Sequence, residues 1–208
     1  ETDISVPLPN KFNSLSSSKV YFVDFPGAKQ SEIRIGSTGL AFTDPDYFKA
    51  TVMNYKLGGN FNGIVNLILR EEKGYTYGAR TTFTGSDFPG YFVASAGVQS
   101  DATLESAQIF RDEMIKYRNG ISAEDLQFTK DALIKSNALR YETIGALRGM
   151  LSQIAWYNLP FDYVKDQERQ ISDMTLEQHK TIAQKYIHPD KMIYLIAGDK
   201  ATQMEKLK

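Results

Sequence analysis

The stretch Lys56-Leu57-Gly58-Gly59-Asn60-Phe61, followed by Leu69-Arg70-Glu71-Glu72-Lys73-Gly74-Tyr75-Thr76-Tyr77, decides the fold. Apolar residues at helical spacing precede Arg70, and Gly74 marks the end of that predicted helix. Tyr77 follows in a run that alternates like a strand. The pattern therefore predicts a helix, a glycine turn and a strand that can direct a guanidinium and a phenol toward one point.

The composition is that of an ordinary globular chain. It has 208 residues, a net charge of −1 and no cysteine. One domain is expected at this length, and it is long enough to bury a core unaided. The absence of cysteine excludes disulfides, thiolate metal sites and cysteine nucleophiles. The balanced charges indicate no nucleic-acid partner.

The order of the elements predicts an α+β fold. Residues 1–18 are polar and rich in Pro and Ser, which is typical of a linker or tether, and residues 19–208 are expected to form a single domain. The expected strands cover 20–25, 30–37, 75–84, 91–99 and 192–197, with helices over 44–57, from 60 or 61 to 73, and through most of 101–188. The first two strands are expected to form an antiparallel pair, and the last is expected to be buried. Antiparallel pairs separated by runs of helices are typical of α+β domains.

Arg70 and Tyr77 are the candidate site residues. Tyr77 is expected on the same strand face as Ala79 and Phe83, so composition alone allows it to be a core residue and Arg70 to be an ordinary surface residue. Arginine is nevertheless suited to holding a peptide carbonyl, because it is always charged and presents a planar fork of donors. A tyrosine hydroxyl can donate to an oxyanion formed in amide hydrolysis.

Other candidate sites are weaker. His179 and His188 are expected on a helix surface and at a helix end, and neither lies in an HxxEH pattern or its inverse, so no zinc site is predicted on this chain. The glycines of 58–63 lack the Lys-Ser/Thr of a phosphate loop and predict a tight turn between helices. Glu71 and Glu72 are expected to be solvated.

The block Leu69–Tyr77 resembles the L-R-E-x-x-G-x-x-Y pattern of the M16 zinc peptidases, the family of pitrilysin, insulinase and mitochondrial processing peptidase. The preceding LGG-x-F element, Leu57–Phe61, resembles the same signature. The resemblance implies a LuxS/metallopeptidase-like half-clamshell, with a mostly antiparallel sheet packed with several helices. In this family one half carries the inverted HxxEH zinc motif on its first helix. The corresponding stretch 44–57 has neither histidine nor glutamate, so the chain resembles the non-zinc half.

The resemblance also implies a role for each candidate residue. Arg70 would bind the substrate backbone, and Tyr77 would stabilise the transition state in trans at the zinc of a partner half. That half, in the same polypeptide or a separate subunit, would supply the zinc, and this chain would hold no cofactor and not be active alone. The substrate would be a peptide, and the isolated domain could pair with itself. A bacterial periplasmic or secreted location would fit the family.

Two alternatives stay open at this point. Some family members have lost catalysis and serve as structural subunits that only assemble with partners. An unrelated α+β binding domain could also share the pattern by chance. Retention of both Arg70 and Tyr77 favours the peptidase interpretation, because scaffolding requires neither.

Overall fold

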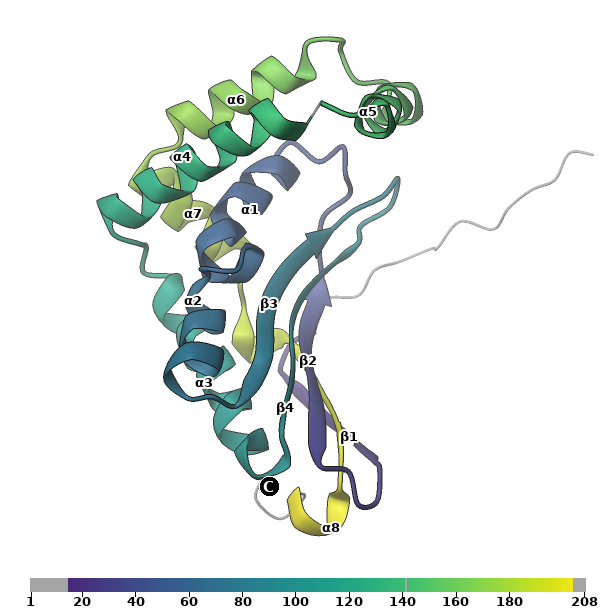
Figure 1. Ribbon diagram of the computed structural model, residues 1–208, viewed down its shortest axis with the longest axis vertical. Helices are drawn as coiled ribbons and strands as arrows, with labels where there is room; N and C mark the ends of the chain where they lie inside the picture. Colours follow the sequence, from purple (N-terminus) through teal and green to yellow (C-terminus); the bar gives the residue numbers. More distant parts are fainter. Residues whose placement is uncertain (1–14, 141, 204–208) are drawn as a thin grey trace, which may run out of the picture.

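The protein is a mixed sheet with helices packed against it (Figure 1). A computed structural model describes residues 15–140 and 142–203. Residues 1–14 of the predicted linker lie outside the described residues. The α+β class expected from the sequence is confirmed.

The sheet has five strands in the order β1-β5-β2-β4-β3. They are β1 (Lys19–Asp24), β2 (Gln30–Thr38), β3 (Thr76–Thr84), β4 (Tyr91–Gln99) and β5 (Ile193–Gly198). Only β1 and β5 run parallel, and the other neighbours are antiparallel. The sheet is therefore mostly antiparallel, with β1 and β3 at its edges.

The expected pairing of the first two strands is wrong. The last strand, β5, lies between them: Ile193 pairs with Lys19 of β1, and Ala197 pairs with Glu32 of β2. Strand β5 buries Tyr194 and Ile196, whereas β1 is largely exposed. The more apolar strand thus takes the inner position and leaves β1 at the edge.

Helices line one side of the sheet and continue beyond its end. The structure contains α1 (Tyr47–Asn54), α2 (Ile64–Asn66), α3 (Thr103–Tyr117), α4 (Ala123–Arg140), α5 (Ile144–Tyr157), α6 (Tyr163–Asp173), α7 (Leu176–Tyr186) and α8 (Lys200–Gln203). Two π-helical segments, η1 (Tyr55–Gly59) and η2 (Leu67–Glu72), extend α1 and α2, and short 3-10 turns occur at η3 (Ser100–Ala102) and η4 (Pro189–Lys191). In Figure 1, α1, α2, α3 and α7 lie on the same side of the sheet, and α4 and α6 lie beyond α1.

Helix boundaries agree with the capping residues in part. Thr175 and Gln178 form the predicted reciprocal capping box at the start of α7. Ser122 Oγ accepts a hydrogen bond from Asp125 N (3.0 Å) at the start of α4. Helix α6 was not identified as a separate helix within the predicted helical region, because its mostly polar sequence between Pro160 and Thr175 shows few apolar residues at helical spacing.

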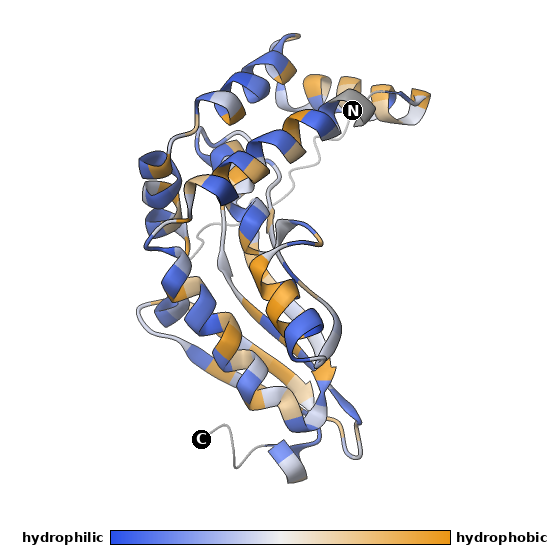
Figure 2. Ribbon diagram, turned by 60° about the vertical axis from the view of Figure 1, so that its left-hand side comes forward, coloured by the Kyte–Doolittle hydropathy of each residue, from blue (hydrophilic) through white to orange (hydrophobic). Residues whose placement is uncertain are grey.

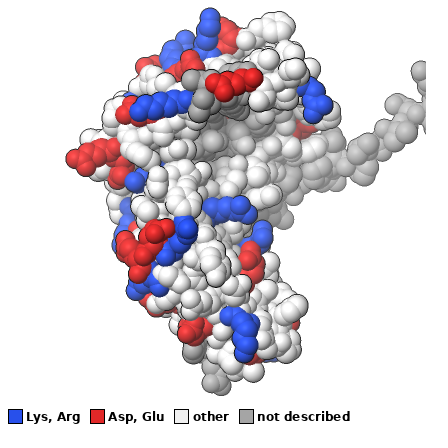
Figure 3. Space-filling view, viewed as in Figure 1, with Lys and Arg blue, Asp and Glu red and all other residues white. Residues whose placement is uncertain are grey.

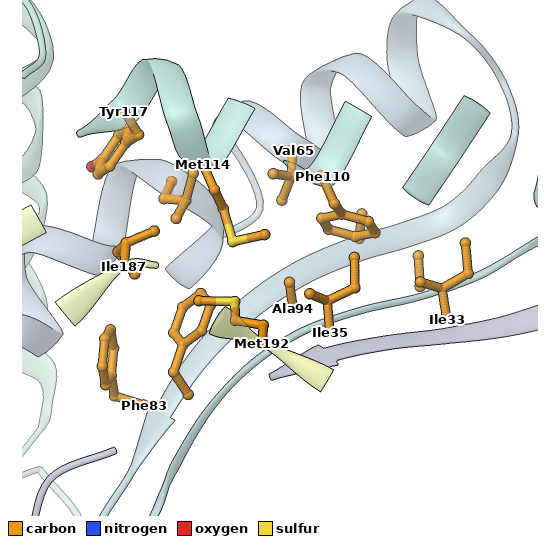
Figure 4. Packing of buried hydrophobic residues seen from close by; sticks show 14 of the residues in the cluster. Ile33, Ile35, Val65, Phe83, Ala94, Phe110, Met114, Tyr117, Ile187 and Met192 are labelled. Atoms are coloured by element: carbon orange, nitrogen blue, oxygen red, sulfur yellow. The ribbon is translucent and has the colours of Figure 1, made fainter. Parts of the chain in front are cut away.

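The core lies between the sheet and the helices on that side. Ile33 and Ile35 of β2, together with Phe92 and Val98 of β4, are fully buried, as the alternation in these strands predicts. Phe110 of α3 belongs to the same buried cluster and lies above Ile33 and Ile35, as Figure 4 shows. Fully burying a large apolar side chain stabilises a fold by about 2 kcal/mol. This core fixes the positions of β3 and α2.

Surface properties follow the composition. Opposite charges are interspersed on the face drawn in Figure 3. Figure 2 shows apolar residues on helices in the middle of the molecule and also along the helices at its upper end. No helix among residues 15–140 and 142–203 has the length and apolar character needed to cross a membrane.

Candidate functional site

The glycine turn packs directly against strand β3. A Cβ atom on Gly58 would lie 2.7 Å from Thr81 N and 2.8 Å from Thr81 Oγ1, so only glycine allows η1 to approach the strand this closely. The predicted tight turn is confirmed, although α2 begins at Ile64 rather than at Asn60 or Phe61. Asn60 Oδ1 accepts from Asn62 N (2.7 Å), and this local bond keeps the intervening residues in a turn.

Two buried asparagines hold this turn region to the edge of β3. Asn54 donates from Nδ2 to Thr81 O (2.9 Å) and accepts from Thr81 Oγ1 (2.6 Å). Asn66 accepts from Ala79 N (2.9 Å) and donates from Nδ2 to Phe61 O (2.7 Å). Side-chain amides therefore satisfy strand groups at an edge that no other strand covers among the described residues.

The π-helical segment η2 carries Arg70. Lys73 N donates to Ile68 O (3.0 Å), an i→i−5 bond that inserts one residue into the helical turn. Gly74 then takes φ = +67°, which glycine adopts without strain, and the chain reverses into β3. Arg70 thus lies just before a sharp turn, as the sequence predicts.

The Arg70 guanidinium rests on an aromatic ring. Its Cζ lies 4.5 Å from the centroid of the Phe61 ring, within the range of a cation–π contact. Nη1 lies 3.2 Å from Glu71 Oε1, an ion-pair contact whose geometry is not that of a hydrogen bond. Nη1 is buried, and the guanidinium donates no hydrogen bond to any residue that the structure describes.

A bulge in β3 turns Tyr77 out of the expected face. Thr76 pairs with Val98 and Ala79 with Ala96, so β3 has one extra residue between these pairs. Thr76 Oγ1 stabilises the bulge by accepting from Gly78 N (3.0 Å) and lies 2.7 Å from the Gly97 carbonyl, to which it donates. The extra residue interrupts the period of two that the sequence analysis assumed.

The predicted placement of Tyr77 beside Ala79 and Phe83 is consequently wrong. Ala79 and Phe83 are buried, whereas Tyr77 is 91% exposed. Its hydroxyl has no hydrogen-bond partner among the residues that the structure describes. The core interpretation of Tyr77 therefore fails, and the phenol is available to a ligand or partner.

An acidic residue of α3 stabilises the loop between Arg70 and Tyr77. Glu105 accepts from Lys73 Nζ (2.7 Å) and from Tyr75 Oη (2.7 Å). These two hydrogen bonds hold the pKa of Glu105 below its ordinary value, the Lys73 bond having the larger effect. Glu71 and Glu72 are exposed as expected, and Glu71 also contacts Arg70.

The two histidines have structural surroundings. His179 was expected on a helix surface, but it is fully buried between α1, α3 and α7. Tyr117 Oη donates to Met53 O (2.7 Å) and lies 3.1 Å from His179 Nε2, so it accepts from Nε2–H. His188 at the end of α7 lies with Nε2 3.0 Å from Lys185 O.

These surroundings do not fit a zinc ion. In the part of the chain that the structure describes, no three His, Asp or Glu side chains are grouped so that they could hold a metal. His179 Nε2 already faces Tyr117, and His188 Nε2 faces a carbonyl. The described residues thus offer no group of metal ligands.

The segments that carry Arg70 and Tyr77, η2 and β3, lie against one another and form a corner, which is connected by two residues that sequence reasoning did not assign. Phe61 covers one side of Arg70, and Asn66 links Phe61 to β3. The signal for Asn66 was present in the sequence: it is a polar residue within the apolar run Ile64–Leu69, and a buried amide requires partners.

Comparison with known proteins gives a consistent family. A model described as the peptidase M16 inactive domain matches residues 5–133. An uncharacterised zinc protease of Streptomyces coelicolor is 27% identical over 131 residues, which cover 62% of this chain and 28% of that protein.

Solved structures show the same fold. The peptidase M16 inactive domain from Pseudomonas fluorescens superposes with a TM-score of 0.81 at 28% identity, covering 88% of this chain and 44% of that chain. A protease from Helicobacter pylori gives a TM-score of 0.79 at 15% identity, and the match covers 95% of this chain and 48% of that chain. The chain thus spans less than half the length of each of these three relatives.

Proposed function

The chain belongs to the peptidase M16 inactive-domain family, and from that membership we propose that it forms the substrate-contacting half of a zinc metallopeptidase. The observation that carries the proposal is the corner holding Arg70 and Tyr77. A buried framework carries an exposed phenol and a guanidinium that pairs with Glu71 but donates no hydrogen bond among the described residues. In the proposal, a second half of the clamshell, in the same polypeptide or a separate subunit, faces this corner.

Arg70 binds the peptide backbone in this proposal. Its guanidinium is held from one side by Phe61, so little conformational freedom is lost when a substrate carbonyl accepts its N–H groups. Arginine remains charged at any pH at which a peptidase works. The contact contributes mainly to binding and to the alignment of the scissile bond.

Tyr77 stabilises the transition state. Its exposed hydroxyl donates to the oxyanion that develops on the scissile carbonyl, and the bulge in β3 keeps the side chain out of the core. Such a donor contributes to rate only if it is already placed when the charge develops. Its framework of main-chain and buried side-chain hydrogen bonds supports that requirement.

Zinc belongs to the partner half in this proposal. The described residues do not fit the ion, and no catalytic step on this chain uses it. The metal-bearing half supplies metal-assisted hydrolysis, and this chain supplies substrate binding and a hydrogen-bond donor. An isolated chain is then expected to cleave no peptide.

A purely structural role is the alternative, and the exposed apolar side chains of α5 favour assembly in either case. Reconstitution of the chain with its zinc-bearing half separates the two roles. With a fluorescence-quenched peptide library as substrate, Tyr77→Phe should lower kcat about a hundred- to a thousandfold without loss of stability. Arg70→Ala should mainly raise KM.

Tyr91→Phe is the matched control, because Tyr91 is also an exposed tyrosine on the sheet. It should leave the rate unchanged. If the Tyr77 and Arg70 variants both assemble, fold and cleave peptides at the wild-type rate, the chain is a structural subunit and the peptidase role is wrong.

A further inference from the structure

Asn66 occupies a central position between the two parts of the site. It is 2% exposed and is the polar residue on the short apolar helix α2. No proposed chemical step uses it. Burial of an amide is costly unless both of its polar atoms are hydrogen-bonded, so its retention there needs a reason.

The Asn66 amide makes one bond to each part of the site. Its Nδ2 donates to Phe61 O (2.7 Å), and Phe61 is the residue whose ring carries the Arg70 guanidinium. Its Oδ1 accepts from Ala79 N (2.9 Å), at the residue where the bulge that exposes Tyr77 ends. One planar group thus connects the Arg70 support to the Tyr77 support.

We propose that Asn66 is a positioning residue that fixes the Phe61–Arg70 pair and Tyr77 relative to one another. The effect of Asn66 on catalysis rests on the proposed peptidase role, whereas its effect on the positions of these side chains does not depend on that role. Asparagine is required because one end of its amide donates and the other accepts. Aspartate keeps the acceptor but loses the donor, and alanine loses both.

Asn54 provides a matched control. It is 4% exposed, and its amide also makes two hydrogen bonds to β3, both to Thr81. Neither of these bonds involves Phe61 or the bulge. Asn54→Ala therefore removes the same number of side-chain hydrogen bonds as Asn66→Ala, both of them at the β3 edge, without touching either support.

Fluorine NMR on the chain of residues 1–208 tests the geometric claim. One sample carries 3-fluorotyrosine at position 77, and a second carries 4-fluorophenylalanine at position 61. The Arg70→Ala variant of the second sample shows the Phe61 signal when no guanidinium lies on the ring. Hydrogen exchange of the Ala79 amide reports its bond to Asn66. Asn66→Ala should shift both fluorine signals and speed Ala79 exchange at least tenfold relative to Asn54→Ala.

Asn66→Asp separates the two connections. Its carboxylate can still accept from Ala79 N–H, so the Tyr77 signal and Ala79 exchange should stay near wild type. It cannot donate to Phe61 O, so the Phe61 signal should shift in the direction that Arg70→Ala causes. This variant also keeps the test decisive if Asn66→Ala does not fold.

Kinetics with the zinc-bearing half then test the catalytic meaning. Asn66→Asp should raise KM about tenfold with kcat retained, whereas Asn66→Ala should also lower kcat about tenfold. Asn54→Ala should change neither, although it lowers the thermal midpoint by a similar amount to Asn66→Ala.

The outcomes distinguish the two claims. If Asn66→Ala matches Asn54→Ala in both fluorine signals and in Ala79 exchange, or if Asn66→Asp leaves the Phe61 signal at its wild-type position, the positioning role is overturned. If the signals move as expected but Tyr77→Phe cleaves at the wild-type rate, the positioning stands and the peptidase role fails.

Discussion

The corner that holds Arg70 and Tyr77 and the helix α5 are built in opposite ways. The corner has an irregular backbone, with two π-helical segments and a bulge, and it buries the Asn54 and Asn66 amides while exposing the Tyr77 phenol. Helix α5 has a regular backbone and buries little. Of its residues only Ile154 is buried, and its single charged side chain is Arg148.

The difference shows where each region obtains its stability. The corner is fixed by hydrogen bonds within the chain and by close backbone contact, so its backbone is held in place without a partner. The exposed apolar side chains of α5 and the loop after it are Ile144, Leu147, Leu151, Trp156 and Phe161. Such exposure marks a surface suited to further contacts, whereas the corner carries the two residues on which the proposed function depends.

The same substitution in the two regions should give the largest contrast. Leu69 is fully buried in η2, and Leu69→Ala should lower the free energy of unfolding by about 4 kcal/mol through lost burial and a cavity. Leu151 is 56% exposed in α5, and Leu151→Ala should change it by no more than about 0.5 kcal/mol. Urea unfolding of both variants measures the difference, and comparable losses would contradict it.

Lowering the pH should destabilise the protein near the corner, because it protonates the buried His179. His179 lies against Tyr117, which bonds Met53 just before Asn54, and burial lowers the pKa of His179 from 6.5 to about 4. The unfolded chain therefore binds the proton more readily. This contribution to stability is complete above about pH 6.5 and is lost as the pH falls toward 4, with a total of about 3 kcal/mol.

Unfolding measured from pH 7 to pH 4 tests this loss. The free energy of unfolding of the His179→Gln variant should be nearly independent of pH between 7 and 4, whereas that of the wild type should fall steadily. Paired carboxylates such as Asp46 and Glu105 have pKa values below their ordinary ones, so they act at lower pH. Equal slopes for the two proteins would show that His179 does not control the acid response.

Replacement of two glycines by alanine should change the stability of the protein in opposite directions. Gly58→Ala places a Cβ 2.7 Å from Thr81 N, so η1 must move away from β3 at a cost of about 2 kcal/mol. A Cβ on Gly149 in α5 would meet nothing within 4 Å, and Gly149→Ala should stabilise the helix by about 0.5 kcal/mol. Thermal unfolding compares the two, and a neutral Gly58→Ala would mean that the close approach is not needed.

The sequence correctly predicted the parts of this fold that follow a regular local pattern. The alternation in β4 and the capping box at Thr175 predicted buried faces and a helix start that the structure confirms. It also located Arg70 and the glycine turns, because glycine and the end of an apolar helix are local signals.

The wrong predictions concern features of the structure that depend on contacts between residues distant in the sequence. The bulge that exposes Tyr77 depends on Thr76 and on strand β4, so the period of two placed this residue on the wrong face. The insertion of β5 beside β1, and the burial of His179, depend on partners more than 50 residues away along the chain. A single sequence shows local periods but not such pairings.

The smallest expected effect concerns how α5 is attached to the sheet. Trp156 Nε1 donates to Asp87 Oδ2 (2.9 Å) in the β3–β4 loop, and Tyr157 stacks on Phe42 with ring centroids 4.1 Å apart. Asp87→Ala removes the hydrogen bond, which is exposed, so the free energy of unfolding should fall by only about 0.5 kcal/mol. Trp156 is the sole tryptophan, so its fluorescence reports this attachment directly.

The Asp87→Ala variant should show red-shifted tryptophan emission and stronger acrylamide quenching, while the corner is unaffected. Asp131→Ala is the matched control, because Asp131 Oδ1 also accepts an exposed 2.9 Å hydrogen bond, from Gln127, at a different helix. If Asp87→Ala leaves the emission unchanged, the Tyr157–Phe42 stack alone holds this end of α5. A change in both variants would instead mean that the emission follows the global fold rather than the local contact.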